Sequence, residues 1–164
     1  MRALLQPDDT GLCAQTCVAM VANVSIEKAH AACGNTALYE AGSMLHEVKR
    51  GLRALGVRHG ATISGFVHRG RKKVATRDIP KFCIAFVSDN KTAWSHAVVI
   101  KDGFVFDPAI GWPIPLWVYE SFIIERAYAR RFRRRAHRHK NVKAFWDQFL
   151  PILKAPTSDD IVQA

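Results

Sequence analysis

Four residues in one order along the chain, a glutamine, a cysteine, a histidine and an aspartate, could together carry out acyl-transfer chemistry. The cysteine, Cys13, opens the apolar run "CAQTCVAMV", which has helical spacing and follows the helix-start residues Thr10 and Gly11. The thiol is therefore expected at a helix N-terminus, where the partial positive charge and the unpaired amides favour a thiolate. This placement makes Cys13 a candidate nucleophile.

A thiolate nucleophile also needs a general base, and the base needs a group that orients it. His96 begins the strand-like run "HAVVI", and Asp107 ends the next such run, "FVFD", with the turn signal "KDG" between them. If the two runs pair as an antiparallel hairpin, the histidine and the aspartate lie side by side. The pattern predicts a Cys-His-Asp triad.

Acyl transfer further needs hydrogen-bond donors for the oxyanion that forms when the nucleophile attacks. Gln6 lies in the segment that leads into the expected helix at Cys13. Its side-chain NH2 group is expected to meet the backbone N–H of Cys13 across the reacting carbonyl. We interpret Gln6 as a group that stabilises charge rather than one that transfers protons.

Three helices followed by strands are expected to position these residues. The helices are the run that begins at Cys13, the run "SIEKAHAACG" between Ser25 and Gly34, and the run "SMLHEVKRGLRALG", which Ser43 can cap. The strands are short runs rich in Val, Ile and Phe, "ATISGFV", "KFCIAFVSD", "SHAVVIKD" and "FVFDPAIG". Helices first and antiparallel strands second predict one α+β domain.

Three further segments have no clear place in that pattern. The segment "GWPIPLW" is too rich in proline for a central strand and is expected at the sheet edge. The segment "FWDQFLPIL" is expected to be a short apolar piece broken by Pro151. The polar, basic run "HRGRKKVATRDIP" is interpreted as a solvated loop, with a role on the substrate side of the site as the alternative.

Length and composition fit a single folded domain. The 164 residues are 49% hydrophobic and 23% charged, which is ordinary for a globular chain and too apolar for a disordered one. The net charge of +10 is concentrated in the stretch from Arg126 to Lys143, which holds nine Lys and Arg residues and no acidic residue. We call this stretch the basic arm. A solvated helix face and a surface for an anionic partner are equally good interpretations of it.

The sequence contains no obvious targeting or membrane segment. The apolar stretch at the N-terminus is too short for a signal peptide, and no run approaches the roughly 20 apolar residues of a membrane helix. We therefore expect a cytoplasmic protein with no membrane partner. In that compartment the four cysteines, at positions 13, 17, 33 and 83, are expected to be free thiols.

Two other roles for the cysteines are open. A cysteine on an apolar helix face usually fills the core, and Cys17, one helical turn after Cys13, is expected to pack inward. Cys13, Cys17, His30 and Cys33 also form a C-x3-C-x12-H-x2-C pattern, which is close to zinc-finger spacing. The interval lacks a hairpin and has the pattern of two helices, so no metal and no cofactor are expected.

The ordered residues resemble a known family. "Q…CAQTCVAMV", "SHAVVI" and "FVFDPAIG", which span most of Gln6 to Gly111, are similar to the bacteriocin double-glycine leader peptidases and their stand-alone relatives, without transporter, among the papain-like cysteine peptidases. The resemblance implies a papain-like fold with N-terminal helices packed on a C-terminal antiparallel sheet. It implies that Gln6, Cys13, His96 and Asp107 are the oxyanion donor, nucleophile, base and orienter.

The resemblance also implies a function and a division of the chain. Residues 1–125 are expected to form the papain-like cysteine peptidase-like domain, and residues 126–164 the basic arm and a C-terminal segment of the same domain. The implied activity is hydrolysis of a peptide or protein-conjugate bond, or acyl transfer where an amine or a thiol replaces water. The competing function is a non-catalytic module that binds nucleic acid, non-specifically, or an acidic protein through the basic arm.

Overall fold

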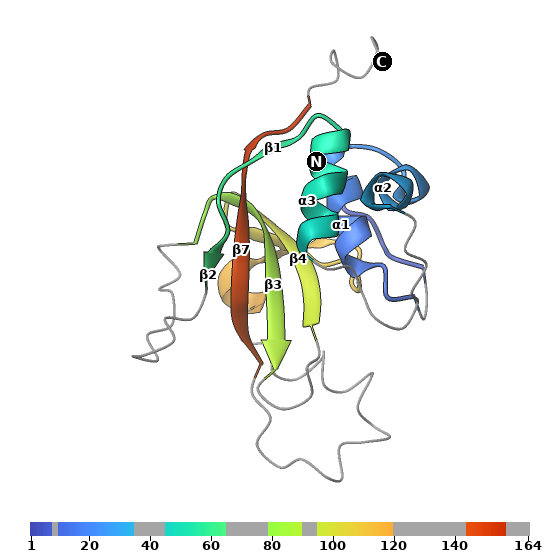
Figure 1. Ribbon diagram of the computed structural model, residues 1–164. Coiled ribbons are helices and arrows are strands. Elements are labelled where there is room, and N and C mark those ends of the chain that lie inside the picture. Colours follow the sequence, from blue (N-terminus) through green and yellow to red (C-terminus); the bar gives the residue numbers. More distant parts are fainter. Residues whose placement is uncertain (8–9, 35–44, 65–78, 90–94, 120–143, 157–164) are drawn as a thin grey trace.

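The computed structural model describes residues 1–7, 10–34, 45–64, 79–89, 95–119 and 144–156 (Figure 1). Three helices, α1 (Cys13–Ala22), α2 (Ile26–Cys33) and α3 (Leu45–Ala54), lie together on one side of a sheet (Figure 1). Residues 116–119, after the last short edge strand, are also helical. Within the described ranges, no helix is long and apolar enough to cross a membrane.

Seven strands form one antiparallel sheet, which runs in the order β1-β7-β3-β4-β5-β6, with β2 also paired to β7. The strands follow the helices in the chain, so the prediction of an α+β chain with helices first and antiparallel strands second is confirmed. The strands are β1 (Arg58–His59), β2 (Ile63–Ser64), β3 (Phe82–Asp89), β4 (Ser95–Lys101), β5 (Phe104–Phe106), β6 (Pro113–Pro115) and β7 (Ala144–Lys154).

Local capping chemistry sets both ends of the second helix, as the sequence predicts, but not the start of the first. α1 begins at Cys13, and Leu12 before it provides no side-chain cap. The hydroxyl of Ser25 accepts a hydrogen bond from the Lys28 N–H at 3.2 Å, which caps α2. Gly34 ends α2 with a left-handed φ of 108°, a conformation that glycine adopts without a steric cost.

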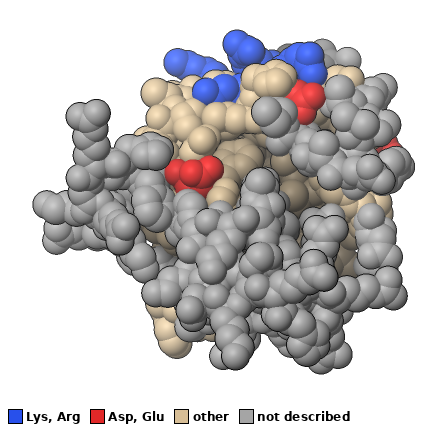
Figure 2. Space-filling model, turned by 60° about the horizontal axis from the view of Figure 1, so that its bottom comes forward, with Lys and Arg blue, Asp and Glu red and all other residues tan. Residues whose placement is uncertain are grey.

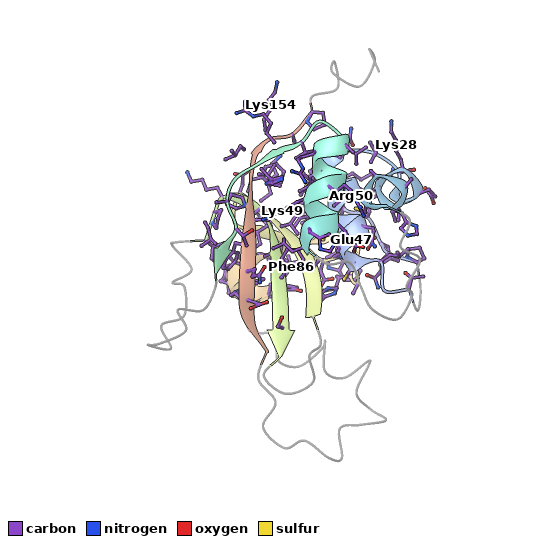
Figure 3. The ribbon with its side chains drawn as sticks, in the orientation of Figure 1. Lys28, Glu47, Lys49, Arg50, Phe86 and Lys154 are labelled. Carbon is purple, nitrogen blue, oxygen red and sulfur yellow. The ribbon has the colours of Figure 1, made fainter. Side chains whose placement is uncertain are left out.

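The contact between α2 and α3 fixes the helical layer. Arg50 of α3 lies between the two helices (Figure 3) and donates from Nε to the carbonyl oxygen of Cys33 at 3.2 Å. A second hydrogen bond runs from its Nη2 to the same oxygen. A cation at a helix C-terminus satisfies unpaired carbonyls and complements the helix dipole. Arg50 therefore fastens α3 to the end of α2.

The sheet has an apolar core on each face, because alternate strand residues point to opposite sides. Ile84 of β3 and Val99 of β4 belong to the core under the helices, whereas Ala85 and Val98 belong to the core on the other face. The second core also contains Tyr119, which follows β6. Both faces of the central strands are therefore buried.

The "KDG" prediction of a hairpin is confirmed. Lys101 of β4 pairs with Phe104 of β5, so only Asp102 and Gly103 form the turn. Both have positive φ, 50° and 82°, which is the combination that a type I′ turn requires. The strand β6 pairs with β5 and ends the sheet, which agrees with the prediction that the proline-rich segment lies at the edge.

The prediction that the segment "FWDQFLPIL" is a short piece broken by Pro151 is wrong. It forms β7, an 11-residue strand that lies between β1 and β3, and Pro151 does not break it. A proline removes only one donor from a ladder. The carbonyl oxygen of Pro151 still accepts the Gly60 N–H at 2.8 Å, and burial of the neighbours Leu150 and Ile152 holds the strand in place.

Several segments that the sequence singles out lie outside the described residues. These are the basic arm, Arg126 to Lys143, the helix-capping position Ser43, and the basic run that begins at His68 as far as residue 78.

Candidate active site

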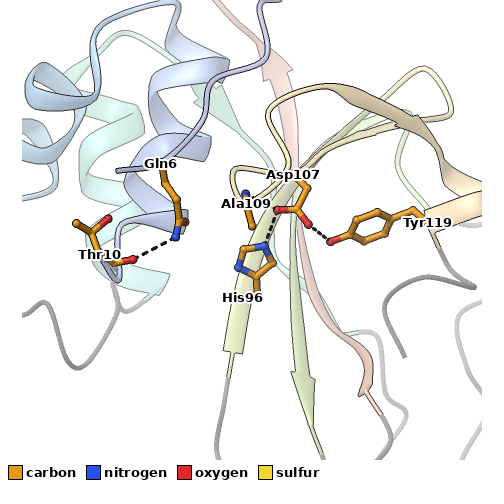
Figure 4. Close-up of polar contacts among 6 residues, drawn as sticks. All are labelled: Gln6, Thr10, His96, Asp107, Ala109 and Tyr119. Atoms are coloured by element: carbon orange, nitrogen blue, oxygen red, sulfur yellow. Dashed lines mark hydrogen bonds and ion pairs between the residues drawn. The ribbon is translucent and has the colours of Figure 1, made fainter. Parts of the chain in front are cut away.

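The β4-β5 hairpin brings His96 and Asp107 together. Val99 pairs with Phe106, so the continued register places Asp107 opposite Val98, one diagonal step from His96 on the same face. The Nε2 atom of His96 lies 2.8 Å from Oδ1 of Asp107 (Figure 4). The side-by-side placement that the sequence predicts for these two residues is present in the structure.

Asp107 is held by donors on both of its oxygens. Oδ1 also accepts the Ala109 N–H at 2.7 Å, and Oδ2 accepts the Tyr119 hydroxyl at 2.6 Å (Figure 4). The carboxylate is only 6% exposed. Burial acts to raise the pKa of Asp107, but the charge and hydrogen bond of His96, the Tyr119 hydroxyl and the Ala109 amide lower it below its ordinary value. Asp107 is therefore an oriented carboxylate.

Cys13 lies on the other side of His96. The groups that act on its thiol are the His96 ring and the backbone amides of Ala97 in β4 and Ala14 in α1. Burial acts to raise the pKa of Cys13, but the hydrogen bond and charge of His96 and the two amides lower it overall. At this helix N-terminus, His96 and the two amides together outweigh the effect of burial and favour the thiolate.

His96 joins the two groups. Since Nε2 faces Asp107, the ring meets the thiol through Nδ1. Burial acts to lower the pKa of His96, yet the charge and hydrogen bond of Asp107 and the contact with Cys13 raise it to about 10. Near neutral pH the arrangement favours an imidazolium between a thiolate and a carboxylate.

The other three cysteines have the opposite electrostatic setting. All four thiols are free, and Cys17, Cys33 and Cys83 are fully buried. Burial raises the pKa of Cys17 well above its ordinary value, that of Cys33 to about 11 and that of Cys83 to about 12. As the sequence predicts, Cys17 packs inward. Of these thiols, Cys13 alone has a lowered pKa.

Gln6 lies next to the Asp107 turn. Its backbone N–H donates to the carbonyl of Pro108 at 2.9 Å, which ties the N-terminal segment to the residue after Asp107. Its side-chain Nε2 donates to the carbonyl of Thr10 at 3.1 Å (Figure 4). An amide nitrogen has two hydrogens, so this bond orients the carboxamide and uses only one of them.

Tyr119 is the site residue that sequence reasoning misses. Its hydroxyl reaches Asp107 across 12 positions of the chain, after the chain has passed through β6. No spacing rule connects a tyrosine in "PLWVYES" with a carboxylate in "FVFDP". The contact follows from the return of the chain across the second face of the sheet.

The zinc-like pattern does not form a site. Across the described residues, no cluster of three or more His, Cys, Asp or Glu side chains could hold a metal ion. Cys13 faces His96, whereas Cys33 lies at the contact between α2 and α3, where a Cβ on Gly51 would be 2.5 Å from its sulfur.

Figure 2 turns forward the end of the molecule where β3 ends and β4 begins. The Lys and Arg side chains that are visible in this view gather along its upper edge, and the described residues below them are mostly uncharged, with single acidic residues among them (Figure 2). Comparisons with protein families, with curated proteins and with solved structures find no match to this chain.

Proposed function

We propose that this protein is a cysteine hydrolase of the papain-like type that cleaves peptide or isopeptide bonds. The observation that carries the proposal is the continuous contact from the Cys13 thiol through His96 to Asp107. A thiol, a base within hydrogen-bond reach and a carboxylate that orients the base are the parts that nucleophilic catalysis needs.

In the first half of the reaction, the Cys13 thiolate attacks the carbonyl carbon of the substrate. The new C–S bond forms, and the electron pair of the C=O bond moves to oxygen to give an oxyanion. When the oxyanion collapses, the C–N bond breaks and the imidazolium of His96 gives its proton to the leaving amine. A thioester on Cys13 and a free amine result.

In the second half, water attacks the thioester and gives a proton to the now neutral His96. The C–S bond breaks, the acid product leaves and the thiolate–imidazolium pair is restored. An amine or a thiol that attacks in place of water would give acyl transfer by the same steps.

The oxyanion is stabilised by the amide at the start of α1 and by Gln6. Leu12 contributes no side-chain cap to α1, so the first-turn amides are not used by a capping side chain. Gln6 keeps a second Nε2 hydrogen beside its bond to Thr10.

Free thiols at all four cysteines support the reducing cytoplasm as the compartment in which the thiolate works.

Alkylation of Cys13 tests the proposal without a known substrate. We expect iodoacetamide to label Cys13, as mapped by mass spectrometry, at pH values well below the free-thiol pKa of about 8.5, because His96 holds the thiol ionised. In His96→Ala the labelling should follow the titration of an ordinary thiol.

The matched control is His59→Ala, which removes a half-buried histidine that is bonded to Gly60 and does not belong to the site. Its labelling profile should equal that of the wild type. Labelling of wild-type Cys13 that is absent, or that titrates as an ordinary thiol, would overturn the proposed function.

A further inference from the structure

Tyr119 is a buried, ionisable residue that the proposed reaction does not use. Its side chain is 4% exposed, and its hydroxyl donates to Oδ2 of Asp107 at 2.6 Å. The other carboxylate oxygen, Oδ1, serves His96 and Ala109. Each oxygen of Asp107 therefore has its own donors. Among the residues that the structure describes, Tyr119 donates to Oδ2.

Aromatic packing fixes the position of this hydroxyl. The Tyr119 ring stacks on Trp146 of β7, with ring centroids 6.2 Å apart and planes 27° apart. Trp146 in turn packs against the buried Phe149 ring at 5.7 Å. The hydroxyl is thus placed by a strand that carries no residue of the Cys-His-Asp site.

We propose that Tyr119 is a positioning residue of the active site, whose hydroxyl orients Asp107 and withdraws charge from it, so that His96 can release its proton to a leaving group. This inference rests on the proposed function, because it concerns the same triad. It adds a role for a side chain that the reaction steps leave unused.

His96, Ala109 and Tyr119 together balance the negative charge of Asp107. A hydrogen bond to a carboxylate stabilises its charged form. Without the hydroxyl, Oδ2 would be a buried acceptor with less compensation, and the carboxylate would depend more strongly on the imidazolium of His96. The proton on His96 would then be held more tightly, and His96 would be a weaker acid.

The surroundings contain few other groups that could produce this effect. Among the described residues, the ionisable groups that act on Asp107 and His96 are Tyr119 and, from α1, Cys13 and Cys17. Substitution of Cys13 by alanine removes the thiolate charge, so that Asp107 and its donors set the proton affinity of His96 in that background.

The experiment is an NMR titration of the His96 ring in Cys13→Ala and in Cys13→Ala combined with Tyr119→Phe. The signal is assigned by its absence in His96→Gln, since the chain has seven histidines. We expect the midpoint of the His96 titration to move upward when the hydroxyl is removed. The control is Ser88→Ala, which removes a hydroxyl that donates to Asp147 at 3.4 Å, and it should leave the midpoint unchanged.

A second variant should move the midpoint of the His96 titration in the opposite direction. Replacement of Tyr119 by 3-fluorotyrosine gives a more acidic phenol and a stronger donor, so the midpoint should move downward. A midpoint that stays still, or that moves in the same direction in both variants, overturns the role of Tyr119. The alkylation profile of wild-type Cys13 is a separate result, so loss of this inference is distinguishable from loss of the proposed function.

Discussion

His96 and Asp107 are joined by a 2.8 Å contact between Nε2 and Oδ1, and a turn of only two residues sets the register that makes this contact. Asp102 and Gly103 both adopt positive φ in that turn. The pairing of base and carboxylate is therefore a property of local hairpin geometry. A change in the turn should be felt at the site.

Gly103→Ala tests how much the turn depends on its left-handed backbone conformation. The φ of Gly103 is +82°, and a left-handed conformation costs a residue with a Cβ about 1–2 kcal/mol, although the added Cβ itself would meet open space. We expect a loss of that size in the free energy of unfolding, measured with urea. Gly60→Ala is the matched control, because its Cβ would make only ordinary contacts with Pro151 and it should cost little.

Alkylation should distinguish the four cysteines in the folded protein. Cys13 has a lowered pKa, whereas burial raises the pKa values of Cys17, Cys33 and Cys83. A short pulse of iodoacetamide at pH 7 should modify Cys13 alone, and all four thiols should react after denaturation. Equal labelling of Cys13 and Cys17 in the native protein would contradict the structure of the site.

The Cys13–His96 pair should leave a range of pH, with its upper limit near 9.0, in which the pair adds no pH dependence to the stability of the protein. In the unfolded chain His96 and Cys13 titrate near their ordinary values of 6.5 and 9.0, and in the folded chain the order is reversed, with His96 at about 10 and the pKa of Cys13 lowered. At pH values above 6.5 and above the lowered pKa of folded Cys13, and up to 9.0, both states hold one proton on this pair, so these residues add no pH dependence.

Outside that window stability should fall. Below 6.5, where Cys13 is still ionised in the folded chain, the unfolded chain binds the extra proton on His96, so stability falls as the pH falls. Above 9.0 the folded chain holds a proton on His96 that the unfolded chain has lost, until about pH 10. In Cys13→Ala the plateau should disappear and stability should decline from 6.5 upward, because the raised pKa of His96 is then uncompensated. Urea denaturation across this range would measure both curves.

Asp107→Asn should leave the Cys13 thiol in place but weaken its activation by His96. The charge of Asp107 is the largest factor that raises the pKa of His96, so its loss lowers that pKa and weakens the thiolate–imidazolium pair. We expect labelling of Cys13 at pH 7 to slow by roughly tenfold or more. Asp147→Asn, which removes a carboxylate bonded to Ser88, should label at the wild-type rate.

Phe149→Ala should destabilise the whole domain. Phe149 lies in the middle of β7 and is fully buried in the core on the second face of the sheet. Loss of such a ring costs about 3–5 kcal/mol of the free energy of unfolding. Leu153→Ala in the same strand removes a side chain that is 65% exposed, and it should change stability by less than about 0.5 kcal/mol.

The parts that sequence reasoning predicts correctly depend on interactions between residues close in the chain. The start of α1 at Cys13, the cap at Ser25 and the two-residue turn at Asp102 follow from backbone preferences over a few positions. The prediction that His96 and Asp107 lie side by side depends only on the two-residue hairpin turn and on the alternation of side chains along the paired strands. Those elements carry most of the candidate site.

The parts that the sequence does not predict depend on distant segments. Pro151 suggests a break in the last apolar segment, but pairing of β7 with strands on both sides outweighs one missing donor. Tyr119 reaches Asp107 because β6 and the residues after it cross the second face of the sheet. Gln6 is bonded to the carbonyl of Thr10, a detail of loop geometry that composition does not encode.

The place of β7 in the sheet also sets an order of events in folding. β3 and β4 leave the ribosome before β7, yet β7 supplies the neighbour of β3 and the Trp146 ring that supports Tyr119. A nascent chain that ends before residue 144 has an open edge on β3 and an unsupported tyrosine. Iodoacetamide labelling of arrested chains of increasing length would show when Cys13 becomes reactive. Long-range pairing of this kind is slow to form. Asp107 therefore gains a Tyr119 hydroxyl in its supported position only after β7 has paired with β3.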